Sequence, residues 1–262
     1  MQVVPVRVLG LLALAFGFLE AAVVVYLRAL LDPTGARFPL VQLPDPLLRL
    51  EMAREAATLV LLVAAAMLAA RGVVSRLAAF CLAFGIWDLA YYAALRIVLH
   101  WPRSLADWDL LFLLPVPWVG PVYALVIVSL TLVVAGGLTL HHEAHHGRFV
   151  AAPATFAVVA LGAAAIFVSF VMPSSALRRG ALPERYPVAL FALGEIAGVA
   201  AFAAAWRRNR ARGNEGITSA APRPPQPLPV AVRPTRAAAF SSAGAPTSTA
   251  TDPASPPPPG ER

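Results

Sequence analysis

The chain has 262 residues and a formal net charge of +7, and 59% of its residues are hydrophobic while only 13% are charged. A water-soluble domain is close to half apolar and a quarter charged, so this composition excludes an ordinary soluble enzyme or regulatory domain. All 21 basic residues are arginine, and the positive charge is concentrated after Trp206, which favours a membrane protein with a basic tail and gives no indication of a nucleic-acid partner. The single cysteine, Cys81, excludes an intrachain disulfide.

Six apolar runs have the length that an α-helix needs to cross a bilayer. They cover residues 6–31, 51–71, 77–99, 122–140, 151–172 and 187–206. The sequence therefore predicts an all-α integral membrane protein, with a bundle of six transmembrane helices over residues 1–212. Residues 213–262 are rich in Pro, Ala and Ser and lack hydrophobic periodicity, which predicts a disordered C-terminal tail.

The arginine distribution predicts the orientation of these helices. An even number of spans places both termini on the same side of the membrane. The run RRNRAR at 207–212 directly follows the last span, and arginine is enriched on the cytoplasmic side of membrane proteins. We therefore expect a multi-pass protein of the bacterial cytoplasmic (inner) membrane, with the lipid bilayer as its immediate partner and both termini in the cytoplasm.

The segment between the third and fourth apolar runs, residues 101–121, is too short to span a membrane. Trp101 and Pro102 end the third helix, and Ser104 to Asp107 match a helix capping box, which predicts a short helical turn before Trp108. Three further prolines interrupt any continuous helix after it. We expect this segment to form a hairpin at the outer membrane interface.

Two motifs carry a resemblance to other proteins: FGIWDLAYY at 84–92 and WPRSLADWDLLFLLPVPWVGPV at 101–122. Together with the opening of the second helix at 51–58, they resemble an uncharacterised bacterial family of small polytopic membrane proteins. The resemblance covers about residues 50–125 and implies an inner-membrane helical bundle. It implies no activity, cofactor or catalytic residue.

Three acidic residues, Glu20, Asp88 and Glu195, fall near the middle of predicted spans. A carboxylate at this depth is unfavourable unless it is protonated, paired or hydrated, so such residues are candidates for a proton or cation relay or a substrate site. The structural alternative is a protonated acid that hydrogen-bonds a neighbouring helix. For Glu195, which lies between Gly194 and Gly198 at the GxxxG spacing of close helix contacts, we favour the structural alternative.

Arginine occurs at similar depths on the first three spans, as Arg28, Arg54 and Arg96. Three guanidinium groups at one level suit a phosphate or carboxylate, which they hold through paired hydrogen bonds. The alternative is that each arginine extends to the headgroups or pairs with a nearby glutamate. The predicted ligand site contains, besides these three arginines, Glu55, Asp88, Tyr92 and Asp109.

The run His141–His146 contains HExxH as His142, Glu143 and His146. On a helix, the two histidines lie one turn apart and can share a zinc ion, with the glutamate as a general base. No third ligand is evident from the sequence, and the alternative is a solvated loop on the inner side.

These observations lead to three functional hypotheses. The first is binding or transport of a small anion or a lipid headgroup in an outward-facing polar pocket. The second is a non-catalytic accessory or assembly subunit with a membrane-protein partner. The third is a metal-dependent membrane enzyme that uses the HExxH run. We lean towards a protein without enzymatic activity.

Overall fold

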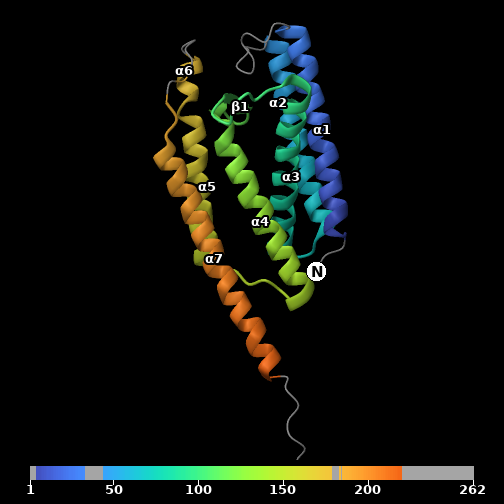
Figure 1. Cartoon of the computed structure of the whole chain (residues 1–262), viewed down its shortest axis with the longest axis vertical. Helices are drawn as coiled ribbons and strands as arrows, with labels where there is room; N and C mark the ends of the chain where they lie inside the picture. Colours follow the sequence, from blue (N-terminus) through green and yellow to red (C-terminus); the bar gives the residue numbers. More distant parts are fainter. Residues whose placement is uncertain (1–3, 33–43, 179–182, 184, 220–262) are drawn as a thin grey trace, which may run out of the picture. The chain divides into compact units, whose positions relative to one another are not determined.

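The computed structural model describes residues 4–32, 44–178, 183 and 185–219 (Figure 1). In chain order, its elements are α1 (Val6–Leu31), α2 (Asp45–Ala69), α3 (Val73–Leu99), β1 (Trp108–Phe112), β2 (Trp118–Pro121), α4 (Val122–His146), α5 (Pro153–Val171), α6 (Ser174–Arg178) and α7 (Val188–Ser219). Six helices among the described residues, α1 to α5 and α7, are long and apolar enough to cross a membrane. This confirms the prediction of a helical bundle and indicates a multi-pass membrane protein.

Several helix boundaries differ from those predicted. α2 begins at Asp45 and has Pro46 in its first turn, where a proline suits a helix start. α4 continues through the histidine run and ends at His146, where Gly147 adopts a positive φ of 87°. α7 continues to Ser219, beyond the position where the tail was expected to begin. The rest of the predicted tail lies outside the described residues.

α3 is the central helix of the first part of the bundle and packs against α1, α2 and α4, while α5 packs mainly against α7 (Figure 1). Glycines allow these close approaches. A methyl group at Gly17 of α1 would clash with the carbonyl oxygen of Trp87, and one at Gly85 of α3 would lie 2.5 Å from the carbonyl oxygen of Ser129. Both glycines lie one turn before an acidic residue, so these contacts bring Glu20 towards α3 and Asp88 towards α4.

The contact between α5 and α7 depends on a different glycine pair from the one predicted. A methyl group at Gly162 would lie 2.7 Å from the carbonyl oxygen of Gly194, whereas one at Gly198 would have no neighbour within 4 Å. The GxxxG spacing correctly indicated a close helix approach at Gly194. Its partner is a glycine of α5, which the sequence pattern alone does not identify.

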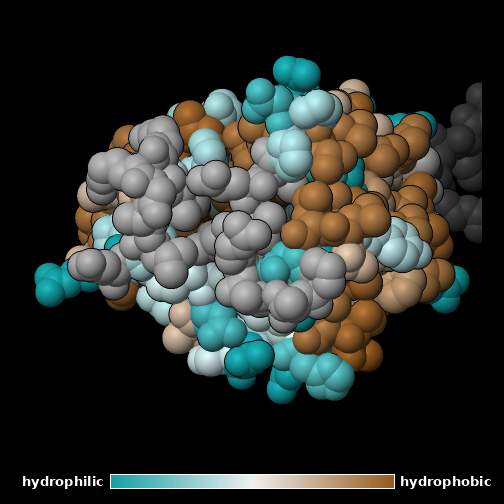
Figure 2. All heavy atoms as spheres, turned by 90° about the horizontal axis from the view of Figure 1, so that it is seen from above, coloured by the Kyte–Doolittle hydropathy of each residue, from teal (hydrophilic) through white to brown (hydrophobic). Residues whose placement is uncertain are grey.

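Residues 101–121 form a turn and two short strands. The Ser104 hydroxyl accepts a hydrogen bond from the Ala106 N–H at 3.1 Å, as in the predicted capping box, but β1 and not a helix follows it. The Asp107 carboxylate accepts hydrogen bonds from the backbone N–H groups of Arg103 and Ser104, at 2.7 and 3.2 Å, and so closes a tight turn. β1 then pairs with β2 in antiparallel register, with Asp109 opposite Gly120. The placement of this segment at the membrane interface stays a prediction. Figure 2 views the molecule from this end and shows hydrophobic side chains over much of one side, with hydrophilic side chains among them.

Candidate functional site

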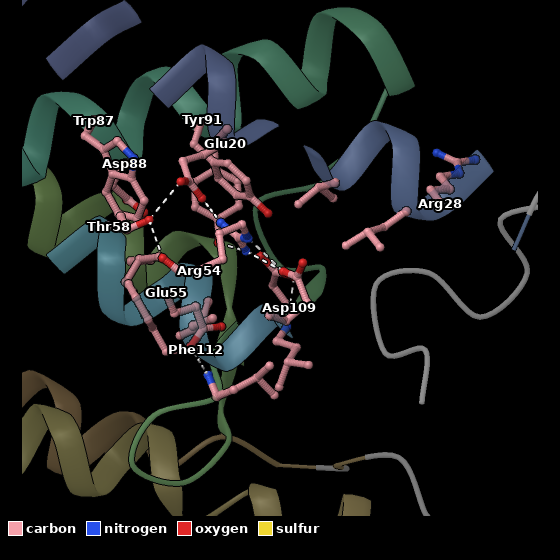
Figure 3. A pocket seen from close by; sticks show the side chains of 18 of the residues that line it. Glu20, Arg28, Arg54, Glu55, Thr58, Trp87, Asp88, Tyr91, Asp109 and Phe112 are labelled. Carbon is pink, nitrogen blue, oxygen red and sulfur yellow. Dashed lines mark hydrogen bonds and ion pairs between the residues drawn. The ribbon is translucent and has the colours of Figure 1, made fainter. Parts of the chain in front are cut away.

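A pocket lies at the end of the bundle where α1, α2 and α3 meet β1 (Figure 3). Its cavity volume is about 130 Å³, well above the ~10–15 Å³ that a single water molecule needs, so it has room for a small ligand. Ionisable and hydroxyl side chains share the lining with aromatic rings and aliphatic residues. The polar lining residues are Glu20, Arg28, Glu51, Arg54, Glu55, Thr58, Asp88, Tyr91, Tyr92 and Asp109.

Most of the residues predicted for a ligand site meet in this pocket. Arg28, Arg54, Glu55, Asp88, Tyr92 and Asp109 all line it, as does the predicted intramembrane acid Glu20. In Figure 3, Arg28 lies apart from the other labelled side chains, which come together around Arg54.

Two predicted residues lie elsewhere. Arg96 is exposed and donates a hydrogen bond to the carbonyl oxygen of His100 at 3.0 Å, so it does not belong to the pocket. The reason is helical geometry: a residue eight positions after Asp88 is rotated by about 80° around the helix axis from it. Glu195 is on α7 and accepts a short hydrogen bond from Thr131 of α4, which matches the structural alternative for this acid.

Arg54 is the centre of the charged network in the pocket. It forms ion pairs with Glu20 and with Glu51, whose Oε2 lies 2.7 Å from one terminal nitrogen of the guanidinium and 2.8 Å from Nε. Thr58 donates to the other oxygen of Glu20 at 2.8 Å. The i, i+3 and i+4 spacing of residues 51, 54, 55 and 58 on α2 places all four side chains on the pocket side. The guanidinium group of Arg54 is therefore already paired with two glutamates.

The other three carboxyl groups accept hydrogen bonds from uncharged donors. Glu55 accepts from the backbone N–H of Leu113 at 2.8 Å, which links α2 to the segment after β1. Asp88 accepts from Ser129 of α4 at 2.7 Å, at the helix contact that Gly85 permits. None of the three forms an ion pair with an arginine of the described residues.

Asp109 is the carboxyl that the hairpin contributes to the pocket. Its side chain is buried, and it accepts hydrogen bonds from the Tyr92 hydroxyl at 2.7 Å and from the Leu110 backbone N–H at 2.8 Å. Burial raises the pKa of Asp109 to about 7, although both hydrogen bonds favour the charged form. Asp109 therefore holds a proton near neutral pH.

Aromatic side chains form much of the remaining pocket wall. The Trp87 ring lies 6.5 Å from that of Tyr91 and 6.2 Å from that of Phe112, and the rings of Tyr91 and Tyr92 are 5.1 Å apart, measured between centroids. The indole N–H of Trp87 is buried and has no hydrogen-bond partner among the described residues. Carboxyl groups beside aromatic faces are the surroundings that organic cations prefer, because the ring faces carry partial negative charge.

The sequence-based site omitted Trp87, Phe112, Glu51, Thr58 and Tyr91, all of which line the pocket. For Glu51 and Thr58 a signal was available, because both share a helix face with Arg54 and Glu55. Trp87 and Phe112 are apolar residues in apolar segments, and no local pattern separates them from residues that only pack or face lipid.

The histidine run lies in the last turns of α4, at the other end of this helix from β2, and its geometry does not fit a zinc site. Glu143 accepts hydrogen bonds from Ser75 at 2.5 Å and from the Phe149 N–H at 3.3 Å. His142 is buried, stacks on His146 and packs edge-on against Trp206. The described residues contain no group of three or more potential metal ligands. His142 therefore packs against α7 and Glu143 bonds to α3, while the other three histidines of the run are exposed.

No family model, curated protein sequence or solved structure matches the chain. The functional inference therefore rests on the pocket.

Proposed function

We propose that this chain is a binding or transport protein of the bacterial cytoplasmic membrane whose pocket takes a small ligand with a positively charged amine or ammonium group. The observation that carries this proposal is the charge of the pocket. Five carboxyl groups line it, from Glu20, Glu51, Glu55, Asp88 and Asp109, against two guanidinium groups, from Arg28 and Arg54. With Asp109 protonated, four carboxyl groups still face two guanidinium groups, and this excess of acids favours a cation over a free anion.

This proposal replaces the anion expected from the sequence. The anion hypothesis required three guanidinium groups facing one ligand. Arg96 lies outside the pocket, and Arg54 is already bound by Glu20 and Glu51. An anion placed beside Arg54 would compete with these two carboxylates, whereas a cation beside the remaining acids gains favourable interactions with them and with the aromatic wall.

The proposed orientation makes this an outward-facing site. The arginine run 207–212 on α7 supports a cytoplasmic position for the end of α7, by the positive-inside rule. The pocket is built from the C-terminal half of α1, the N-terminal part of α2 and the hairpin between α3 and α4. With both termini in the cytoplasm, these parts lie on the outer side of the membrane.

The experiment is a thermal unfolding assay on purified protein in detergent. Choline chloride represents a free ammonium ligand, dihexanoyl phosphatidylcholine represents a lipid headgroup with the same cationic group, and sodium phosphate represents a free anion. We expect one or both cationic probes to raise the unfolding temperature with a saturable dependence on concentration. Phosphate stabilisation without any effect of the cationic probes would refute the proposal.

Two variants make this assay specific for the pocket. Glu55→Gln removes one pocket charge and retains an oxygen that accepts from the Leu113 N–H, so we expect weaker cation binding by a folded protein. Arg96→Gln removes an exposed charge outside the pocket and is the matched control, with unchanged binding. Equal loss of binding in both variants would also contradict a pocket site.

The accessory-subunit hypothesis relied on a C-terminal tail that recruits a partner. Most of that tail lies outside the described residues. That hypothesis also predicts polar bonds between helices, and Glu20 with Arg54 and Asp88 with Ser129 form such bonds, but these residues line a cavity as well. We therefore keep it as the alternative that applies if no probe binds.

A further inference from the structure

Asp109 differs from the other acids that line the pocket in its position. It is the only one of the five contributed by the hairpin, whereas the other four lie on α1, α2 and α3. Its side chain is 3% exposed, and both oxygens accept hydrogen bonds, from the Tyr92 hydroxyl and the Leu110 N–H. Among the described residues it forms no ion pair, because the ion pairs of Arg54 go to Glu20 and Glu51.

A buried carboxylate with hydrogen-bond donors but no paired cation carries a charge that a proton or a bound cation can neutralise. Two kinds of partner can therefore occupy the same position, but not both at once. Burial raises the pKa of Asp109 to about 7, so the proton is present below about pH 7 and is lost above it. The ionisable groups that face it across the pocket are Glu20 and Arg28 on α1, Glu51, Arg54 and Glu55 on α2, and Asp88, Tyr91 and Tyr92 on α3. Their acids outnumber their arginines, which further favours the protonated form.

We propose that the cationic ligand exchanges for the proton of Asp109, so that the pocket binds either a proton or the ligand. In the exchange, the O–H bond of the protonated carboxyl breaks, the proton passes to water, and the positive charge of the ligand neutralises the carboxylate. One positive charge leaves as another enters, so the net charge of the pocket is unchanged. This inference rests on the proposed function and deepens it, because a protein with such a site in a membrane can exchange protons for cations across it.

Tyr92 adjusts the balance between the two occupants. Its hydroxyl donates to Asp109 at 2.7 Å and therefore favours the charged carboxylate, which is the form that receives the ligand. Removal of the hydroxyl raises the proton affinity of Asp109 and shifts cation binding to higher pH. Tyr92 is thus a positioning residue, and its effect is seen in the pH profile.

The test is isothermal titration calorimetry of choline binding to the full chain in detergent, in phosphate and in MOPS buffer. The two buffers differ in ionisation enthalpy, so the difference in observed heat counts the protons released. Below about pH 7, we expect release of about one proton per choline bound and an affinity that rises about tenfold per pH unit, with a plateau above it. Asp109→Asn resembles the protonated carboxyl, so it should bind choline more weakly, with no dependence on pH through this window and without proton release.

A second pair of variants keeps the proposal testable if Asp109→Asn does not fold. Tyr92→Phe should move the midpoint of the pH profile upward. Tyr123→Phe removes a hydroxyl from a residue that does not line the pocket and should leave the midpoint in place.

The possible outcomes separate the two levels of the proposal. Choline binding with equal heats in both buffers overturns the proton exchange and leaves the proposed function intact. Proton release that persists in Asp109→Asn, or a midpoint that is the same in Tyr92→Phe and the wild type, also overturns the assignment to Asp109. Absence of binding by either cationic probe at every pH refutes the proposed function itself.

Discussion

The ion-pair network around Arg54 gives the sharpest stability prediction. Glu20 and Glu51 are buried, at 6% and 7% exposure, and Arg54 forms the only ion pairs that either carboxylate makes among the described residues. Arg54→Met keeps most of the aliphatic packing and leaves two buried carboxylates without a cation. Loss of one partner from a buried ion pair destabilises a protein by about 3–5 kcal/mol, which shifts the unfolding equilibrium by roughly 10²- to 10⁴-fold.

The assay for this prediction is equilibrium unfolding in mixed micelles of mild detergent and SDS, followed by tryptophan fluorescence. The triple variant Glu20→Gln, Glu51→Gln, Arg54→Met replaces the network with uncharged groups and should recover most of the lost free energy. Arg96→Met is the matched control and should change stability by less than about 0.5 kcal/mol, because Arg96 is exposed. The reasoning is refuted if Arg54→Met is as stable as the wild type, or if the triple variant is no more stable than the single one.

Three further predictions use the same unfolding assay. Gly162→Ala should destabilise the α5–α7 contact by about 1–3 kcal/mol, because its methyl group meets the backbone of the facing helix. Gly198→Ala has open space around it and should be tolerated, so equal losses of stability in the two variants would contradict the contact. Burial raises the pKa of Asp109 to about 7, so between about pH 4 and pH 7 the folded chain holds a proton that the unfolded chain has lost. The free energy of unfolding of the wild type should therefore fall relative to that of Asp109→Asn by on the order of 4 kcal/mol as pH rises through that window. Parallel pH curves for the two proteins would count against this prediction. Asn209→Ala should destabilise the protein by about 1–3 kcal/mol, because the buried amide bonds to both the N–H and the C=O of Val150, each at 2.9 Å. Arg210→Ala, at an exposed position, should be neutral, and a neutral Asn209→Ala would show that water replaces these bonds.

The transmembrane architecture could be predicted from the sequence because bilayer thickness sets a minimum length for an apolar helix. Each of the six apolar runs corresponds to one helix of the structure. The helix ends were harder to predict. The sequence left the histidine run either on a helix or in a solvated loop. α4 continues through it, and Ser75 and Trp206 provide contacts for Glu143 and His142. Such contacts come from other helices and leave no local signal.

The composition of the candidate site was partly predictable, and its charge balance was not. Acids and arginines inside apolar segments are conspicuous, which is why Glu20, Arg54 and Asp88 were selected from sequence alone. Their pairing depends on contacts between helices, and the ion pair of Arg54 with Glu20 is one reason why we propose a cation in place of the anion predicted from the sequence. Arg96 was misplaced because the i, i+4, i+8 pattern drifts around a helix by about 40° at each step.

The segment before β1 shows how one pattern can fit two structures. The Asp107 carboxylate accepts from the Ser104 N–H and the Ser104 hydroxyl accepts from the Ala106 N–H, as in a capping box, yet a strand and not a helix follows. A short polar motif satisfies nearby backbone donors in either conformation. The antiparallel pairing of β1 with β2 decides the outcome here, and it is a contact across a loop that contains Pro115 and Pro117.

The central claim is that the pocket binds a cation, and direct binding of radiolabelled choline to purified protein, measured by a scintillation proximity assay, tests it most directly. The account predicts saturable binding at one site per chain that unlabelled phosphate does not displace. It also predicts weaker binding in Glu55→Gln and unchanged binding in Arg96→Gln. Labelled phosphate that binds saturably, and that choline does not displace, would contradict it.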